Sequence, residues 1–373
     1  MPSITTNTTQ TLVELLSHLV RFPTVTSDHA TNSAALDWVE EQLSGLPLHI
    51  RRYQSKGHPS LVATTRDTKS PKLWLAGHID VVPGPSESYE PKVAGGRLYG
   101  RGAHDMKFAL ATFIALLQEL GDSLAELDLG LMISSDEEVG GFNGVGYLVE
   151  TLGYRGQTVF LPDTNSDWKF EMGAKGVMWW DVTAKGVASH AGRAWQGVNA
   201  IDELIRFVDH VRANFQTEPC HDPDHPHATF NLGTISGGTA ANAVPDSASA
   251  RIDIRYPAEV SADVIAFWFE AAHAAVPTVE AKLAITDTPY LVPNDGPIHH
   301  FERIAEAVTG RKLGRFVAHG SSDARFFARH GGHSVNICPT GSGFHMPTEW
   351  IDIADLTRFY EVTRQFVQDW ARA

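Results

Sequence analysis

The sequence has few cysteines, no long apolar run and no basic segment. Its two cysteines, Cys220 and Cys338, lie far apart in 373 residues and in no metal-like spacing. This usage argues against a disulfide framework and a cysteine zinc site, and it favours a reducing, cytoplasmic location. No window reaches the roughly 18 apolar residues that cross a bilayer, and the first segment lacks the basic and apolar regions of a secretory signal.

The sequence also contains fewer basic than acidic residues. Lysine and arginine number 30 against 44 acidic residues, which gives a formal net charge of −14. A nucleic-acid backbone or an anionic membrane surface would repel such a chain, so we expect neither as a partner. Bound divalent cations could instead neutralise part of this charge.

Two catalytic motifs are absent. The sequence has no Gly-x-Ser-x-Gly elbow and no His-Glu-x-x-His pair. Their absence argues against a serine hydrolase and against a thermolysin-like protease. Hydrophobic residues make up 43% and charged residues 20% of the chain, which is ordinary for a globular protein long enough for two domains.

Acidic and histidine side chains stand where predicted strands end. These are His78 and Asp80 in PKLWLAGHIDVVP, Asp136, Glu137 and Glu138 after LDLGLMISS, Asp163 closing QTVFLPD, and His345 and Glu349 after the strand in HSVNICPTGSGFHMPTEW. Asp105 stands where a glycine-rich segment becomes a helix that Gly121 ends. Alternating strands and helices predict a mostly parallel sheet, whose ligand crevice lies at the carboxyl ends of the strands. We therefore expect these side chains to line one crevice.

Two imidazoles among several carboxylates form the ligand set of a hydrolytic divalent-metal centre. This ratio indicates two metals that share a bridging carboxylate, a pair that can hold hydroxide and polarise a carbonyl. Asp80 is placed to accept the second ring N–H of His78. One carboxylate has to stay off the metals to take a proton from water, and the residues alone do not distinguish Glu137 from Glu138 in this role. Taken alone, an acidic triplet is also typical of a solvated surface.

Five stretches together resemble a family of dinuclear zinc deacylases and peptidases. They are GHIDVVP, GRGAHDMK, SSDEEVGG, LPD and GFHMPTEW, in family order from residue 77 to residue 350. The family includes acetylornithine deacetylase, succinyl-diaminopimelate desuccinylase, aminoacylase, carboxypeptidase G and carnosinase-type dipeptidases. One position departs from it, because Phe108 stands where the family commonly has glycine.

The resemblance implies two divalent ions per subunit, zinc first, with cobalt or manganese as alternatives. It implies the metal ligands His78, Asp105, Glu138, Asp163 and His345, with Asp105 bridging. It also implies Glu137 as the general base and Asp80 as the residue that orients His78.

Residues 176–289 change pattern, with predicted elements in the order β-α-β-β-α-β. This order is the ferredoxin-like motif. We predict an α/β metal-binding domain of residues 1–175 and 290–373, with a mostly parallel sheet and flanking helices, and an inserted ferredoxin-like α+β lid. By resemblance, the lid pairs with a second lid in a homodimer.

Three lid residues are candidate substrate contacts. The resemblance implies that His190 in ASHAG stabilises the oxyanion, that Asn242 in ANAVP makes a polar contact and that Arg255 in DIRYP binds a carboxylate. Arg255 could instead pair with Asp253.

Two glycines and a group of histidines have simple structural interpretations. Gly341 and Gly343 make a turn, or alternatively offer backbone contacts to the substrate. His221, His225 and His227, in a proline-rich loop, are expected to be solvent-exposed rather than a metal site.

The predicted function is metal-dependent hydrolysis of an amide bond in a small amino-acid derivative. Overall likeness favours the deacetylase and desuccinylase subgroup. Asp163 favours a dipeptidase or aminopeptidase instead, since the deacylases of the family usually have glutamate at this ligand. An inactive metal-binding scaffold is the alternative of another class, but such a scaffold could dispense with Glu137.

Overall fold

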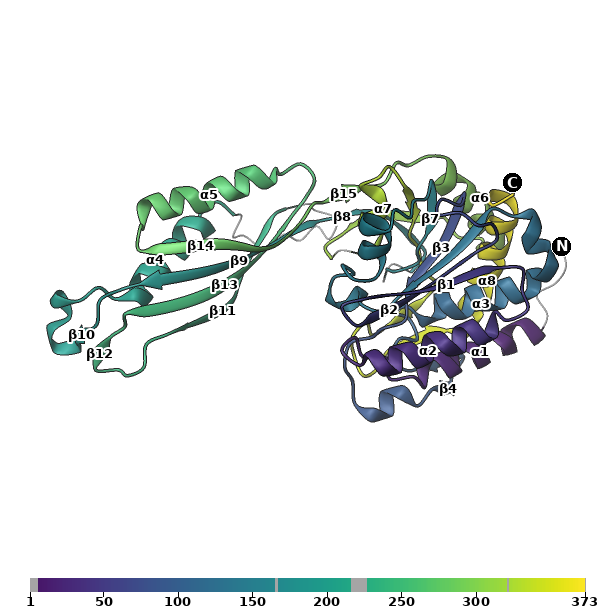
Figure 1. Ribbon diagram of the computed structural model, residues 1–373, viewed down its shortest axis with the longest axis horizontal. Helices are drawn as coiled ribbons and strands as arrows, with labels where there is room; N and C mark the ends of the chain where they lie inside the picture. Colours follow the sequence, from purple (N-terminus) through teal and green to yellow (C-terminus); the bar gives the residue numbers. More distant parts are fainter. Residues whose placement is uncertain (1–5, 165–166, 216–226, 321, 373) are drawn as a thin grey trace. The chain divides into compact units, whose positions relative to one another are not determined.

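The computed structural model describes residues 6–164, 167–215, 227–320 and 322–372. The chain forms two compact units (Figure 1). Unit 1 comprises Met1–Met172, Val292–Phe316 and Ser322–Ala373, and unit 2 comprises Gly173–Leu291 and Val317–Ser321. Unit 2 is therefore an insertion in the sequence of unit 1, and each unit is described by itself.

Unit 1 is built on a six-stranded sheet in the order β1-β2-β6-β3-β7-β17. The strands are β1 (His49–Ser55), β2 (His58–Thr64), β3 (Leu73–His78), β6 (Leu129–Ser134), β7 (Thr158–Phe160) and β17 (His333–Val335). The β6-β3, β3-β7 and β7-β17 pairs are parallel, whereas β1 and β2 join antiparallel at one edge. The predicted α/β class with a mostly parallel sheet is confirmed.

Helices cover this sheet on both faces, which explains why β3 and β6 are buried along their whole length and mostly apolar. On one face, Trp74 and Ala76 of β3 pack with Leu148, Phe326 and Phe327. On the other face, Phe160 of β7 lies in an aromatic cluster. Its ring centroid is 5.9 Å from that of Phe113, 5.2 Å from that of Phe301 and 5.8 Å from that of Phe359.

The α-helices of unit 1 include the one predicted to end at Gly121. They are α1 (Thr6–Val20), α2 (His29–Gln42), α3 (Lys107–Leu120), α6 (Gly296–Thr309), α7 (Ala324–Ala328) and α8 (Ile353–Trp370). Gly121 ends α3 with a φ of 49°, a conformation that favours glycine. The segment GVGYLVETLG contains the π-helical turn η4 (Tyr147–Thr151).

One core helix is apolar enough to resemble a membrane span. The segment Lys107–Glu126, which contains α3, is long enough and has a high enough mean hydropathy to cross a membrane, although it is not an unbroken apolar run. In the structure, 67% of its most apolar window is buried inside the protein. Composition alone therefore does not separate this helix, which packs on the sheet, from a membrane span.

Small sheets bring distant segments together. The order β18-β19-β5-β4 joins β18 (Gly341–Ser342) and β19 (Trp350–Asp352) to β5 (Arg97–Tyr99) and β4 (Lys92–Ala94). Another sheet has the order β15-β8-β16, from β15 (Tyr290–Leu291), β8 (Lys169–Ala174) and β16 (Gly314–Ala318). The first of these sheets sets the GFHMPTEW segment beside the chain that leads to Asp105.

Unit 2 has the predicted ferredoxin-like order of elements. Its strands β9 (Gly176–Lys185), β11 (Thr229–Gly237), β13 (Ser247–Tyr256) and β14 (Val279–Asp287) form an antiparallel sheet in the order β11-β13-β9-β14. The helices α4 (Ala200–Arg212) and α5 (Ala262–Ala275) pack on it through residues that include Phe207 and Phe269. A separate two-stranded ribbon pairs β10 (Ser189–His190) with β12 (Ala243–Val244).

Phe108, the residue that departs from the family pattern, is fully buried in α3. Its ring stacks on His104 at a centroid distance of 5.9 Å and meets Phe359 of α8 edge-on at 5.4 Å. The side chain therefore fills the core between two helices.

We predict that Phe108→Ala lowers the free energy of unfolding by about 3–5 kcal/mol, because it leaves a cavity in this core. The measurement is urea-induced unfolding followed by circular dichroism. Val93→Ala, at a side chain of unit 1 that is 54% exposed, is the control and should change stability by no more than about 0.5 kcal/mol. Equal unfolding midpoints for the two variants would contradict the packing role.

Candidate metal centre

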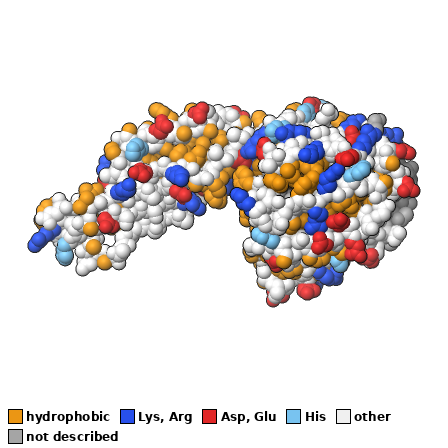
Figure 2. Space-filling model, viewed as in Figure 1, with side chains coloured by type: hydrophobic (Ala, Val, Ile, Leu, Met, Phe, Trp, Pro, Cys, Tyr) orange, Lys and Arg blue, Asp and Glu red, His pale blue; other side chains and the backbone are white. Residues whose placement is uncertain are grey.

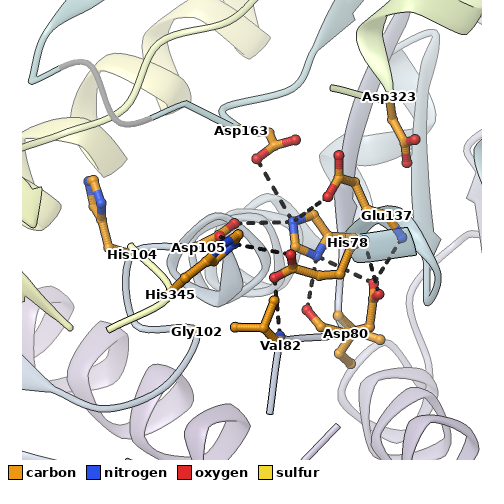
Figure 3. Close-up of polar contacts among 12 residues, drawn as sticks. His78, Asp80, Val82, Gly102, His104, Asp105, Glu137, Asp163, Asp323 and His345 are labelled. Carbon is orange, nitrogen blue, oxygen red and sulfur yellow. Dashed lines mark hydrogen bonds and ion pairs between the residues drawn. The ribbon is translucent and has the colours of Figure 1, made fainter. Parts of the chain in front are cut away.

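The carboxyl ends of three neighbouring parallel strands meet at one edge of the unit 1 sheet. His78 is the last residue of β3, Glu137 and Glu138 follow β6 in the 3-10 turn η3 (Glu137–Val139), and Asp163 follows β7. Asp105 lies just before α3, and His345 lies between β18 and β19. Their side chains converge (Figure 3).

One group of possible ligands consists of His78, Asp105 and Asp163, all of them buried. The Nε2 atom of His78 lies 3.3 Å from Oδ1 of Asp105 and 3.8 Å from Oδ1 of Asp163. Both distances allow the nitrogen and the oxygens to contact a single ion placed between them.

A second group consists of Asp105, Glu138 and His345. Nε2 of His345 lies 3.0 Å from Oδ2 of Asp105 and 3.1 Å from Oε2 of Glu138. Asp105 thus offers one oxygen to each group, which is the arrangement that a bridging carboxylate requires.

The location of the ring hydrogen on His78 indicates whether a cation fits between His78 and Asp105. Its Nδ1 faces two acceptors of Asp80, the backbone oxygen at 2.9 Å and Oδ1 at 3.4 Å, so Nδ1 carries the ring hydrogen. Nε2 is buried and has no hydrogen-bond partner among the described residues. In the neutral imidazole its lone pair then faces the Asp105 carboxylate, and a cation between the two relieves the repulsion.

Electrostatics at Asp105 and His345 favour positive charge in the same place. Burial by itself raises the pKa of Asp105, but the neighbouring imidazoles of His345 and His78 outweigh burial and lower it. Hydrogen bonds to Asp105 and Glu138 raise the pKa of His345 to about 10. The Asp105 carboxylate therefore stays ionised, beside a ring nitrogen of His345 that attracts a proton or a metal ion.

Asp80 acts differently from the sequence-based expectation. Its backbone carbonyl makes the shorter contact to His78, rather than its carboxylate. The carboxylate accepts hydrogen bonds from Thr26 Oγ1 at 2.8 Å and from the backbone N–H groups of Glu137 and Glu138, both at 3.3 Å. Asp80 thus orients the imidazole and also anchors the turn after β6.

The geometry separates the two neighbouring glutamates that the sequence left equivalent. Glu138 contacts His345, and its Oε1 accepts the backbone N–H of Val82 at 3.3 Å. Glu137 belongs to neither ligand group, and its Oε2 lies 4.0 Å from Nε2 of His78. Burial and the negative charge of Asp163 raise the pKa of Glu137 well above its ordinary value.

Asp323 is a neighbour of this site that the sequence reasoning missed. It is 2% exposed and labelled beside Glu137 in Figure 3, and burial raises its pKa to about 7. Its Oδ2 accepts a hydrogen bond from Ser134 Oγ at 3.3 Å. The only signal in the sequence was an acidic residue before the short helix α7.

His190 and Asn242 lie together in unit 2. Nδ1 of His190 accepts the backbone N–H of Gly192 at 3.0 Å, and the backbone oxygen of Asn242 accepts the N–H of Ala191 at 2.9 Å. The hydrogen of a neutral His190 ring is therefore on Nε2, where it can be donated to a ligand.

Arg255 is not brought together with these residues within unit 2. It lies near the far end of β13, so the strand rise of about 3.3 Å per residue places it tens of ångströms along the sheet from the loop that carries Asn242. Its Nε and Nη2 atoms form a two-point pair with Asp253 at 2.9 and 3.1 Å. Of the lid histidines, His221 and His225 lie outside the described residues.

Close packing explains the two glycines before His345. A Cβ on Gly341 would lie 2.2 Å from the ring of His104. Gly343 has a φ of 84°, and a Cβ there would lie 2.8 Å from the Cα of Glu349. Both positions exclude a side chain even before a substrate is considered.

Most of the chain is similar to known amide and peptide hydrolases. The model described as Peptidase family M20/M25/M40 matches residues 74–369. Succinyl-diaminopimelate desuccinylase of Halorhodospira halophila is 27% identical over 363 residues, which cover 92% of this chain and 94% of the relative. The enzyme of the same name from Psychromonas ingrahamii is 29% identical over 322 residues, 80% of this chain and 83% of the relative.

Solved structures show the same fold. Aminopeptidase PepT from Bacillus cereus has a TM-score of 0.77 at 19% identity, and the match covers 97% of this chain and 99% of that chain. Human carnosine dipeptidase 1 has a TM-score of 0.72 at 14% identity, with 98% and 97% covered.

We predict that Gly341→Ala lowers the thermal unfolding midpoint by several degrees, because its methyl group collides with His104. Differential scanning calorimetry without substrate measures this. Gly320→Ala, where a Cβ meets nothing within 4 Å, is the control and should leave the midpoint unchanged. If Gly341→Ala keeps the midpoint and only raises KM, Gly341 serves substrate contact instead of packing.

Proposed function

The chain belongs to Peptidase family M20/M25/M40, and from this membership we propose that it removes the acyl group from a small N-acyl amino acid. Membership makes the chain a metal-dependent hydrolase of amide or peptide bonds. One observation carries the proposal for its centre: a single carboxylate, Asp105, is shared by two groups of metal-ligand type.

The proposed centre holds two divalent ions, preferably zinc, with cobalt or manganese as alternatives. One position uses His78, Asp105 and Asp163, and the other uses Asp105, Glu138 and His345. Such a pair of ions lowers the pKa of a water molecule and polarises the carbonyl group that is attacked. The surrounding residues keep the ligands in place, Asp80 through the second ring nitrogen of His78 and through the turn of Glu138.

Glu137 is the proposed general base, because it lies against His78 but outside both ligand groups. It takes one proton from water while the hydroxyl oxygen bonds to the carbonyl carbon. It then delivers this proton to the amide nitrogen as the C–N bond breaks, which yields a carboxylic acid and an amine. A scaffold without turnover would have no use for a largely enclosed carboxylate in this position, 14% exposed.

Unit 2 supplies three of the proposed substrate contacts, and unit 1 supplies the two glycines. A proton on Nε2 of His190 suits a donor to the oxyanion, and Asn242 beside it suits a polar contact. Arg255 is proposed to bind a substrate carboxylate by exchanging its partner Asp253, and Gly341 and Gly343 are proposed to offer their backbone.

We also propose a homodimer formed through unit 2, in the cytoplasm, with no nucleic-acid or membrane partner. Unit 2 exposes large hydrophobic side chains, which include Trp195 at 80%, Phe267 at 64% and Ile235 at 51%. Hydrophobic side chains are visible over this unit in Figure 2. Exposed apolar groups of this size suit an interface between two copies of the chain.

The substrate class rests on the relatives that align with most of the chain, which are named succinyl-diaminopimelate desuccinylases. The runner-up is a dipeptidase or aminopeptidase. It is favoured by Asp163, since the deacylases of the family usually have the longer glutamate at this ligand, and Oδ1 of Asp163 lies 3.8 Å from His78 Nε2. The additional room beside that position suits a free amino group.

We predict that Glu137→Gln keeps the bound metal but lowers kcat by about 10²–10⁴-fold, the usual contribution of a general base. Glu138→Gln should instead lose about one metal ion per chain. Steady-state kinetics and elemental analysis of the two variants measure these effects. Metal loss in Glu137→Gln with full metal in Glu138→Gln would show that the two glutamates have exchanged roles.

We predict that the zinc-loaded enzyme hydrolyses N-succinyl or N-acetyl amino acids with a higher kcat/KM than unblocked dipeptides. Liquid chromatography of the released amines, across a matched panel with the same amino acid on the amine side, measures the preference. Turnover confined to substrates with a free amino terminus would replace the deacylase proposal by the dipeptidase one.

A further inference from the structure

Glu349 is a buried carboxylate with four hydrogen-bond donors around it. Its side chain is 1% exposed. Oε2 accepts from Arg101 Nη1 and from the backbone N–H of Gly102, both at 3.0 Å. Oε1 accepts from the backbone N–H groups of His104 at 2.8 Å and Asp105 at 3.0 Å. One carboxylate therefore fixes the backbone of the loop that ends at the bridging residue.

Arg101 links this loop to the segment that carries His345. While Nη1 contacts Glu349, Nη2 donates to the backbone oxygen of His345 at 3.1 Å. The Arg101 side chain is 3% exposed, so little water competes for either contact. The His345 ring, in contrast, is 52% exposed and sits on a backbone with a φ of 59°. The hydrogen bond from Arg101 therefore restrains His345, whose exposed ring is restrained little by packing.

Sheet pairing brings the two segments into register. Trp350, next to Glu349, pairs with Tyr99, two residues before Arg101. The backbone N–H of Gly100 also donates to the carbonyl of Glu349 at 3.1 Å. The segments are 248 positions apart in sequence, and this pairing sets Glu349 beneath the Gly102–Asp105 loop.

A purely stabilising role explains this arrangement poorly. A buried ion pair gains little net stability over apolar residues of the same volume, because both charges have to leave water. The contacts are instead directed at the backbones of Asp105 and His345, two of the three ligands in the second group. His78 and Asp163, the other ligands of the first group, are carried by β3 and the segment after β7.

We propose that Arg101 and Glu349 form a positioning pair that sets the separation of Asp105 and His345, and thereby the affinity of the metal position formed by Asp105, Glu138 and His345. This inference rests on the two-metal centre proposed above. Neither residue touches the metal in this account, and both act through the backbones of the ligands. Groups that orient metal ligands in this way typically contribute about 10–100-fold to metal affinity.

The test compares cobalt binding to the metal-free full-length protein in the wild type and in two variants, Arg101→Met and Arg101→Lys. Isothermal titration calorimetry resolves the two binding steps, and the visible absorption of bound Co²⁺ reports the ligand geometry. Arg101→Lys keeps the positive charge beside Glu349 but replaces the two-armed contact. Arg364→Met is the matched control, since Arg364 pairs with Glu361 within α8 and is 15% exposed.

Both Arg101 variants should weaken one of the two cobalt-binding steps about 10–100-fold, with a changed absorption spectrum, and leave the other step within about threefold. Arg364→Met should leave both steps unchanged. Circular dichroism confirms that each variant is folded, and Arg101→Lys serves if Arg101→Met does not fold.

Two results would overturn the positioning role. The first is unchanged cobalt affinities and spectra in the folded Arg101 variants. The second is equal weakening of both cobalt-binding steps, which indicates a general loss of rigidity in the protein. A wild-type protein that binds fewer than two cobalt ions overturns the two-metal proposal itself and this inference with it.

Discussion

The structure depends on one constraint, the confinement of several negative charges in a small buried space. Asp105, Glu137, Glu138 and Asp163 converge at the end of the sheet, and like charges at such distances strongly disfavour joint ionisation. Two imidazoles alone cannot balance them, and Nε2 of one of them, His78, is buried 3.3 Å from a carboxylate oxygen of Asp105. Divalent cations bound between the carboxylates offset this repulsion. The repulsion in the metal-free protein therefore favours metal binding.

Placing these charges requires rigid supports that are not themselves ligands. The parallel strands deliver His78 and the glutamates, whereas Asp105 and His345 come from loops. Glu349 accepts a hydrogen bond from the backbone N–H of Asp105, and Arg101 donates one to the backbone oxygen of His345. Both loops are therefore held by buried charged side chains. In the proposed centre, strands therefore hold one set of ligands and buried hydrogen bonds hold the other.

The sequence predicted the parts of the site that follow from the repeating strand-helix pattern. His78, Asp163 and the acidic triplet were identifiable because parallel strands bring their carboxyl ends to one edge. The roles of Glu137 and Glu138 came only from the family resemblance, because adjacent residues in a turn point in directions that their identity does not decide. The Arg101–Glu349 contact depends on pairing β5 with β19 across most of the chain, and the use of the Asp80 backbone carbonyl leaves no trace in residue identity.

The central claim is that one carboxylate bridges two metal ions. Crystallography of the zinc-loaded protein, with anomalous data at the zinc edge, tests it most directly. The account predicts two peaks about 3.5–4 Å apart, one against His78 and Asp163, the other against Glu138 and His345, with Asp105 contacting both. A single peak, or two peaks of which only one contacts Asp105, would contradict it.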